Sequence, residues 1–472
     1  MQHPSIDADD VHPEHTTGRW MMDGRRATGC CDEKEEEEVD DGVVPFSSRH
    51  CLQFELAVYV KSSFRSAECA LSFIMSGPDS SLVHILTSCL SHDPALRVPA
   101  ETTLQASLAQ AHGCTIQLLH VIIAAATVPP HVRVLAATCF KNCIAKRWKK
   151  VQAHAISPDE KAQARVLCAS CLLLPEPAIF RIVMAAAAKM LRSDWTSSEW
   201  PDLLPNVVSL ASSPDPASAR RGMQALYLLV RELSSMSTLS DRQKFVSACP
   251  QIAVIVAPAW QQLLPQVPSS AEVAEAARIV AKVYKHALMR SAALAVPGGP
   301  IFAFLESCCQ ICSFTSDICS GRAQCACTEQ IMALTRTIFS CFRAFIKMLP
   351  VQCSTILRNL AGASVQLLVS CSHSHAYAIN DAAASLASKS IAVLEAILVE
   401  NLYRSNSTRG TGDPAAKQQA VAAFDSFFTG ATVGQLVDLL ASSYCILTPA
   451  QLARWEQSPE VFSHEYDAQV CV

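Results

Sequence analysis

From about Ser80 onward, the sequence is a succession of mainly apolar segments separated by proline, glycine and serine. Gly113 stands between "AETTLQASLAQ" and "CTIQLLHVIIAAAT", and Pro129 and Pro130 precede "HVRVLAATCFKNCIAKRW". Within these segments, apolar residues recur at the three- and four-residue spacing of a helix, and no alternating strand pattern competes. Glycine is scarce, with 15 residues, which favours helices packed through small side chains over sheets. The sequence therefore predicts an all-α fold.

The predicted helices are grouped in pairs, and the pairs recur at roughly forty residues, the period of HEAT and armadillo repeats. One such pair cannot bury its inner face alone, so successive pairs stack and share a continuous core. A compact helical bundle is the competing fold, but it would need an unusually large number of helices around one core. We therefore expect an α-solenoid of HEAT-type helical hairpins, an armadillo-like superhelix.

Local signals place the starts of two helices. Pro99 suits the first position of the helix that continues through "AETTLQASLAQ". Ser157, Pro158 and Glu160 occupy the N-cap, N1 and N3 positions of the next hairpin, which is a capping-box arrangement. We expect helices that begin at Pro99 and at Pro158.

Residues 1–78 differ from the rest of the chain. They contain the acidic run "DEKEEEEVDD" (Asp32–Asp41) and scattered glycine, proline, histidine and serine, a composition typical of a disordered extension. The net charge of the whole chain, −4, is too small to indicate binding to nucleic acid or to an anionic membrane. No signal peptide is visible, and no unbroken apolar run reaches about 18 residues, so we expect a soluble intracellular protein without membrane insertion.

The 22 cysteines are scattered through helical segments, which predicts buried free thiols in a reducing compartment. The densest group consists of Cys308, Cys309, Cys312, Cys319, Cys325 and Cys327. Zinc binding is the less favoured interpretation, because the second pair has C-x-C spacing and no histidine lies among them. His373 and His375 near Cys371 favour a polar loop over a metal site for a similar reason. Because no hydrolase or nucleotide-binding motif is present, we expect no enzyme, catalytic residue, metal or cofactor.

The segment Val132–Trp148 combines an apolar stripe with a basic end. The stripe consists of Val132, Leu135, Ala136, Cys139, Phe140, Cys143, Ile144 and Trp148, at the spacing of one broad helix face. We expect Trp148 to fill the seam between adjacent helix pairs, and Trp200 to be packed in the same way. A docking slot for a segment of a partner protein is the less favoured interpretation of the two rings.

The basic residues of this segment are expected to lie outside the core. Lys141 and Lys149 repeat with Ala145 every four residues on the side opposite the stripe. Arg147 and Lys149 also suit the negative end of the helix dipole. The alternative is a solvated surface that binds nothing in particular.

Two stretches carry a resemblance to a known family. They are "LRVPAETTLQ" (Leu96–Gln105) and "HVRVLAATCFKNCIAKRW" (His131–Trp148). The agreeing residues are Arg97, Ala100, Glu101, Leu104, Arg133, Ala136, Lys141, Asn142, Ile144 and Trp148. In this arrangement the chain resembles the N-terminal domain of the importin β family of nuclear transport receptors (karyopherins). Further along, "EWPDLLPNVV" looks like a later repeat, with the Trp200–Pro201 pair that the family often carries.

A second match narrows the resemblance. "YCILTPAQLARWEQSPEVFSHE" (Tyr444–Glu465) is similar to a segment of the importin-eleven branch of the family. The two matches occur in the order that the family has. Because family members are longer, the resemblance implies that this chain supplies the N-terminal half of the solenoid.

Composition sets apart residues 1–78 as a disordered acidic extension, which is not part of the family's usual pattern. The resemblance implies three further segments: 79–150, the importin N-terminal domain with the first HEAT repeats; 151–443, further HEAT repeats; and 444–472, a truncated loop and helix segment. It implies a receptor that binds the GTPase Ran in its GTP form, carries protein cargo into the nucleus and binds nucleoporin Phe-Gly repeats. Such a receptor shuttles between nucleus and cytoplasm through the pore of the nuclear envelope. The alternative is a helical-repeat scaffold or truncated paralogue without transport activity.

The same resemblance implies where Ran binds. The candidate contacts are Lys141, Asn142, Arg147 and Lys149. The competing interpretation is that Asn142 caps a neighbouring turn and the lysines are only solvated.

Overall fold

The computed structural model describes residues 79–110, 112–149, 155–373, 381–404, 414–445 and 449–460. They all belong to one compact unit, Leu52–Val472. The expected extension of residues 1–78 lies outside the described residues. Throughout the described part, the secondary structure is helical and contains no strand, so the all-α prediction is confirmed.

The α-helices of the first half are α3 (Ser80–Cys89), α4 (Pro94–Gln110), α5 (Cys114–Ile123), α6 (Pro130–Arg147), α7 (Pro158–Ser170), α8 (Pro177–Asp194), α9 (Leu203–Ala211), α10 (Pro216–Ser234) and α11 (Leu239–Leu263). Those of the second half are α12 (Ala271–His286), α13 (Pro300–Cys319), α14 (Thr328–Met348), α15 (Pro350–Cys353), α16 (Leu357–His373), α18 (Asp381–Val399), α19 (Pro414–Phe427), α20 (Gly430–Leu439) and α21 (Pro449–Gln457). Short turns of helix are η1 (Cys171–Leu173), η2 (Leu264–Ser269), η3 (Leu288–Arg290), η4 (Ala292–Leu294), η5 (Asn401–Tyr403) and the π-helical η6 (Leu440–Tyr444).

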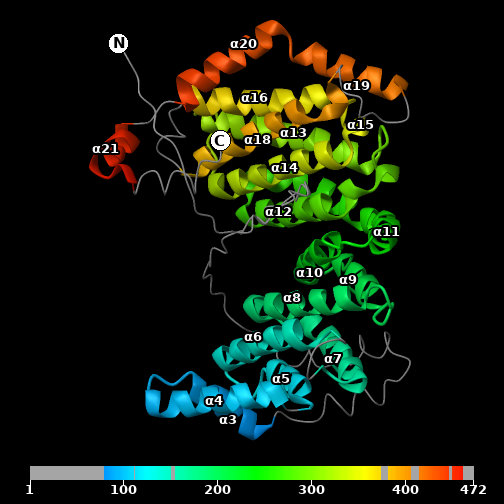
Figure 1. The fold of residues 1–472 in the computed structure, drawn as a ribbon, viewed down its shortest axis with the longest axis vertical. Coiled ribbons are helices and arrows are strands. Elements are labelled where there is room, and N and C mark those ends of the chain that lie inside the picture. The colour runs from blue at the N-terminus through cyan, green and yellow to red at the C-terminus, as the bar shows by residue number, and fades with distance from the viewer. Residues whose placement is uncertain are drawn as a thin grey trace, which may run out of the picture. The chain divides into compact units, whose positions relative to one another are not determined.

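The helices stack as successive hairpins (Figure 1). The hairpins include α5–α6, α7–α8, α9–α10, α11–α12, α13–α14 and α16–α18. The second helix of each hairpin packs against the second helix of the next, in the order α6, α8, α10, α12, α14, α18. Because each hairpin covers its neighbour, one continuous apolar core runs from Leu82 to Leu436. The predicted solenoid of helical hairpins is confirmed.

The start of α4 differs from the prediction. The helix begins at Pro94, and Pro99 lies inside it. Asp93 determines this start, because its carboxylate accepts a hydrogen bond from the backbone N–H of Ala95 at 2.9 Å. Pro94 is then the first helical residue, a position where a missing N–H costs little. The prediction of a start at Pro99 was wrong because two suitable prolines follow one another and the cap precedes the first.

Among the residues that the structure describes, one helix is long and apolar enough to cross a membrane, Ala382–Val399 in α18. The bent pairs Pro94–Ala109 with Cys114–Ile123 and Pro414–Phe427 with Gly430–Tyr444 meet the same criterion of length and composition. In the described structure, α18 packs against α14 and α16, and its Leu386 and Val393 are fully buried. The apolar composition of α18 is therefore used in packing between hairpins.

Candidate functional site

The four residues predicted to contact Ran lie at the C-terminal end of α6, but not on one surface. Asn142 and Lys149 are exposed, and Lys141 is partly buried. Arg147 is only 7% exposed. Its Nη1 donates a hydrogen bond to the backbone carbonyl of Leu108 in α4 at 2.7 Å. The expectation that Arg147 lies outside the core was wrong, and its guanidinium instead ties α6 to α4.

The spacing of the apolar stripe contains the signal for this burial. Arg147 stands three residues after Ile144 and four after Cys143, both of which are buried. It is therefore on the apolar face of α6, not on the face of Lys141 and Lys149. A buried guanidinium needs hydrogen-bond partners, and a backbone carbonyl of a neighbouring helix supplies one here.

A second buried arginine holds the other end of α6. Arg133 is 1% exposed, and its Nε donates to the carbonyl of Ile122, near the end of α5, at 2.7 Å. The Arg133 guanidinium also forms an ion pair with Glu176, which precedes α8. Burying such a pair gives little net stability, but it restricts how α5, α6 and α8 meet.

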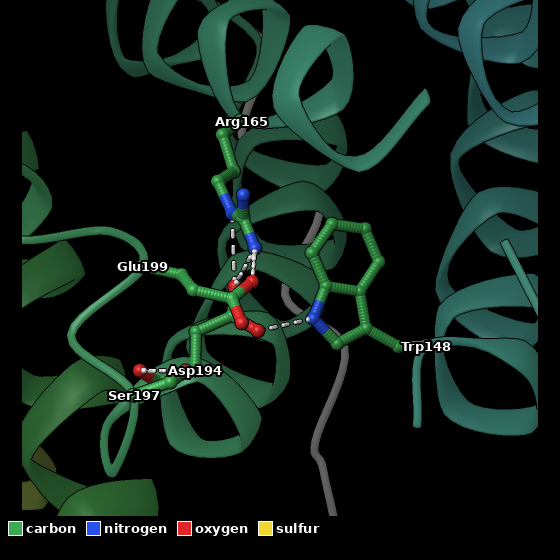
Figure 2. Close-up of polar contacts among 5 residues, drawn as sticks. All are labelled: Trp148, Arg165, Asp194, Ser197 and Glu199. Carbon is green, nitrogen blue, oxygen red and sulfur yellow. Dashed lines mark hydrogen bonds and ion pairs between the residues drawn. The ribbon is translucent and has the colours of Figure 1, made fainter. Parts of the chain in front are cut away.

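Trp148 closes the seam between α6 and the next hairpin, as predicted. The ring is 2% exposed, and its Nε1 donates to Asp194 Oδ1 at 2.9 Å (Figure 2). Lys161 Nζ and Arg165 Cζ from α7 lie 5.4 Å and 5.5 Å from the ring centroid, within cation–π range. Trp148 therefore links α6, α7 and α8. Trp200 is also buried, as predicted.

The carboxylate that receives the Trp148 hydrogen bond belongs to a small buried network. Arg165 Nε donates to Asp194 Oδ2 at 2.9 Å, and the same guanidinium pairs with Glu199 (Figure 2). Burial raises the pKa of Asp194, although the hydrogen bonds from Trp148 and Arg165 favour its charged form. The network fixes the last turn of α8 against α6 and α7.

Glu160 has a role that the capping-box interpretation missed. Ser157 Oγ accepts a hydrogen bond from the Glu160 backbone N–H at 3.3 Å, so the N-cap prediction is confirmed. The Glu160 carboxylate, however, accepts from the backbone N–H groups of Gly113 and Thr115 at 3.0 and 3.2 Å. It therefore caps the start of α5 rather than its own helix, an interaction between residues 47 positions apart that no local pattern predicts.

An exposed strip remains on α6 once these buried contacts are accounted for. We define the α6 strip as Lys141, Asn142, Ala145 and Lys146 of α6 together with Lys149, which lies just beyond the end of the helix. All of these residues but Lys141 are exposed. The strip is basic, carries an amide, and belongs to a helix fixed at both ends by buried polar contacts. It is therefore a rigid surface that suits an acidic partner surface.

An apolar groove opens further along the solenoid, between the hairpins α9–α10 and α11–α12. Its volume is about 980 Å³, and its lining includes Pro214, Val254, Pro258, Leu263 and Val280. Val254 is 74% exposed, which is unusual for an aliphatic side chain on a packed helix. The groove can take apolar or aromatic side chains.

The described residues contain no group of three or more histidine, cysteine or acidic side chains that could hold a metal ion. Cys308, Cys312 and Cys319 are buried in α13, whereas Cys325 and Cys327 lie in the loop before α14, with Cys327 at its N-cap. His375 is outside the described residues.

The profile of the Importin-beta N-terminal domain matches residues 100–173. The matched range extends past residue 150, where the sequence analysis placed the end of the N-terminal domain, and includes α5, α6, α7 and η1. It therefore contains the α6 strip and the buried side chains of Arg133, Arg147 and Trp148.

Among curated proteins, the chain is 23% identical to mouse importin-11 over 413 residues, which is 83% of this chain and 40% of the relative. Human importin-11 gives 23% over 406 residues, again 40% of its length. The chain thus spans about two fifths of these relatives. The Nonsense-mediated mRNA decay protein 5 of Saccharomyces cerevisiae is 26% identical over 162 residues, covering 32% of this chain and 15% of the yeast protein.

Two solved structures share the fold. Lph2, a bidirectional nuclear transport receptor of S. cerevisiae, has a TM-score of 0.61 at 17% identity, with 81% of this chain and 38% of that chain covered. The exportin Cse1 in its cargo-free state has a TM-score of 0.59 at 14% identity, with 81% and 39% covered. The chain thus contains a match to the Importin-beta N-terminal domain, is similar to part of importin-11, and shares its fold with two solved transport receptors.

Proposed function

We propose that the chain acts in nuclear transport, binding Ran in its GTP form through its first repeats and carrying protein cargo between cytoplasm and nucleus. The match to the Importin-beta N-terminal domain, the similarity to part of importin-11 and the shared fold support this proposal. Import, as implied by the similarity to importin-11, is the direction that we propose. Binding of Ran and of cargo is expected to be antagonistic, in which case each changes the affinity for the other by the same factor.

The observation behind the Ran proposal is the α6 strip inside the matched N-terminal domain. Lys141, Asn142 and Lys149 are proposed to contact Ran. Arg147 is not included among the proposed contacts, because its side chain is buried. No hydrogen bond or ion pair joins Lys141 or Lys149 to another described residue, so both ammonium groups are available to acidic side chains of a partner.

Charge reversal tests the Ran proposal. We expect Lys149→Glu to weaken binding of Ran locked in its GTP form about three- to tenfold, because one rim charge pair is worth roughly 1 kcal/mol. The matched control is Lys347→Glu, an exposed lysine in the last turn of α14, which changes the net charge equally. Equal affinities of the two variants would refute the assignment of the α6 strip.

The apolar groove is our proposed docking site for nucleoporin Phe-Gly repeats. A phenylalanine ring needs an apolar recess, and the groove offers valine, leucine and proline side chains from two adjacent hairpins. Val254→Asp is expected to reduce binding of a Phe-Gly repeat peptide at least fivefold by placing a charge in the recess. Val437→Asp on α20, also an exposed valine, is the control and is expected to leave binding unchanged.

The alternative function is a helical-repeat scaffold without transport activity. A pulldown with Ran in both nucleotide states separates the two functions. Capture that depends on GTP supports the receptor. Equal capture, or none, in both states favours the scaffold.

A further inference from the structure

Two cysteines next to α14 lie within contact of each other. Cys325 and Cys327 have Sγ atoms 3.1 Å apart. Cys325 is partly exposed, while Cys327, at the N-cap of α14, is buried. The loop that carries them follows α13 and turns at Gly321, whose φ of +73° suits glycine. When an accessible thiol contacts a buried thiol, the accessible sulfur can react with a disulfide from solution, and the buried sulfur can then displace the attached group from the mixed disulfide.

Both thiols face backbone carbonyls of the preceding hairpin. Cys325 Sγ donates to the carbonyl oxygen of Pro268 at 3.0 Å. Cys327 Sγ lies 3.5 Å from the same oxygen and 3.7 Å from that of Val267. Pro268 and Val267 belong to η2, between α11 and α12. The dithiol therefore connects the turns of two consecutive hairpins.

Three cysteines of the neighbouring helices are inaccessible to a reagent from solution. Cys308, Cys312 and Cys341 are fully buried in the core, and burial raises the pKa of each thiol. Burial and the contact with Cys325 also raise the pKa of Cys327, to about 11. A buried thiol with a raised pKa is a poor attacking nucleophile, so the partly exposed Cys325 is the residue that an incoming reagent meets first.

We propose that Cys325 and Cys327 form a thiol–disulfide exchange site that reacts with low-molecular-weight disulfides of the glutathione type. In the first step the Cys325 thiolate attacks one sulfur of oxidised glutathione, the glutathione S–S bond breaks, and one glutathione thiolate leaves. In the second step the Cys327 thiolate attacks the Cys325 sulfur of the mixed disulfide and releases the second glutathione. The chain loses two electrons and two protons, and one oxidised glutathione becomes two reduced molecules.

The disulfide has a structural consequence at the contact with η2. Both S–H donors disappear when the S–S bond forms, so the carbonyl of Pro268 loses its thiol partners. We expect faster amide hydrogen exchange around η2 in the oxidised chain, with no change at α5–α6. The proposal is independent of Ran and of cargo, so its failure would leave the proposed function untouched.

The sequence allows this chemistry to be followed without interference from the other cysteines. Trypsin cleaves after Arg322 and Arg336, so the peptide Ala323–Arg336 contains Cys325 and Cys327 and no other cysteine. The full chain is equilibrated with oxidised glutathione, its free thiols are alkylated, and the chain is digested with trypsin. The mass of this peptide is then measured by mass spectrometry. We expect the mass of the peptide to be lower by two hydrogen atoms, because a disulfide has formed, and we expect neither cysteine to carry the alkylating group.

Two variants separate the roles of the thiols. Cys327→Ser is expected to retain glutathione on Cys325, because the resolving thiol is gone. Cys325→Ser is expected to react at least tenfold more slowly, because only the buried thiol remains. Cys445, a single exposed thiol, serves as the internal reference for reagent activity.

Three results would overturn the proposal. In the first, the peptide keeps two free thiols while Cys445 carries glutathione. In the second, wild type and Cys327→Ser retain equal glutathione on Cys325, which would mean that Cys327 does not reach the mixed disulfide. In the third, the disulfide forms without any change in exchange at η2, which would remove the link between the hairpins.

Discussion

Gly222 in α10 packs directly against the backbone of α9, and replacing it by alanine tests the packing of the solenoid. A Cβ atom at this position would lie 2.3 Å from the backbone nitrogen of Ala211 and 2.6 Å from its Cα. Ordinary van der Waals contact begins at 3.4 Å, so α9 and α10 must separate by about 1 Å to admit one methyl group. The atoms in the way are backbone atoms, which cannot rotate aside.

The magnitude follows from two opposing terms. Alanine favours a helix interior over glycine by about 1 kcal/mol. Overpacking against backbone costs about 1–3 kcal/mol and sometimes more, and here the shift also disturbs the apolar groove beside Ala211 and Met223. We expect Gly222→Ala to lower the free energy of unfolding by up to about 2 kcal/mol. Gly362→Ala in α16, where nothing lies within 4 Å of the added Cβ, is expected to raise it by up to about 1 kcal/mol.

The assay is guanidinium denaturation followed by circular dichroism, combined with hydrogen exchange because long repeat arrays unfold in stages. Exchange in α9 and α10 should accelerate in Gly222→Ala and not in Gly362→Ala. If the two alanine variants had equal stability, or if Gly222→Ala were the more stable, the described contact between α9 and α10 would be refuted.

Three further predictions concern buried polar groups. Trp148→Phe keeps most of the ring but removes the hydrogen bond to Asp194, so we expect the free energy of unfolding to fall by about 1–2 kcal/mol. Hydrogen exchange should show reduced protection of α7 and α8, and unchanged protection would contradict this prediction. The pKa of His286 is lowered to about 3 by burial and by nearby cations, so the native state binds fewer protons than the unfolded state, and stability is lost as pH falls below 6.5. In this pH range, the free energy of unfolding of the wild type should fall by up to about 1.4 kcal/mol per pH unit more than that of His286→Gln. Parallel pH profiles of the two proteins would argue against this prediction. Arg147→Leu leaves the carbonyl of Leu108 without its buried donor, so we expect thermal unfolding to show about 1–3 kcal/mol of destabilisation. Unchanged stability would show that the buried guanidinium is dispensable.

The sequence alone predicted the solenoid because the information lies in short-range patterns. Helical spacing, proline and glycine punctuation and the repeat period each extend over a few residues or one hairpin. Trp148 was predicted correctly for the same reason, since it continues the apolar stripe of α6.

The buried polar contacts were not predicted, because their partners are distant along the chain. Arg147 binds a carbonyl 39 residues away, and Glu160 caps a helix whose first residues precede it by 45 or more. A charged residue in an apolar stripe indicates burial only when a partner is known, and tertiary packing supplies that partner. The position of Arg147 relative to Ile144 was the one local signal that indicated its burial.

The proposed function depends on nucleotide-dependent recognition of Ran by the first repeats. Isothermal titration calorimetry of the full chain with Ran, loaded either with a non-hydrolysable GTP analogue or with GDP, measures this dependence. We predict at least tenfold tighter binding of the GTP form, a difference of about 1.4 kcal/mol or more. Equal affinity for the two forms, or no heat of binding with either, would refute the proposed recognition of Ran.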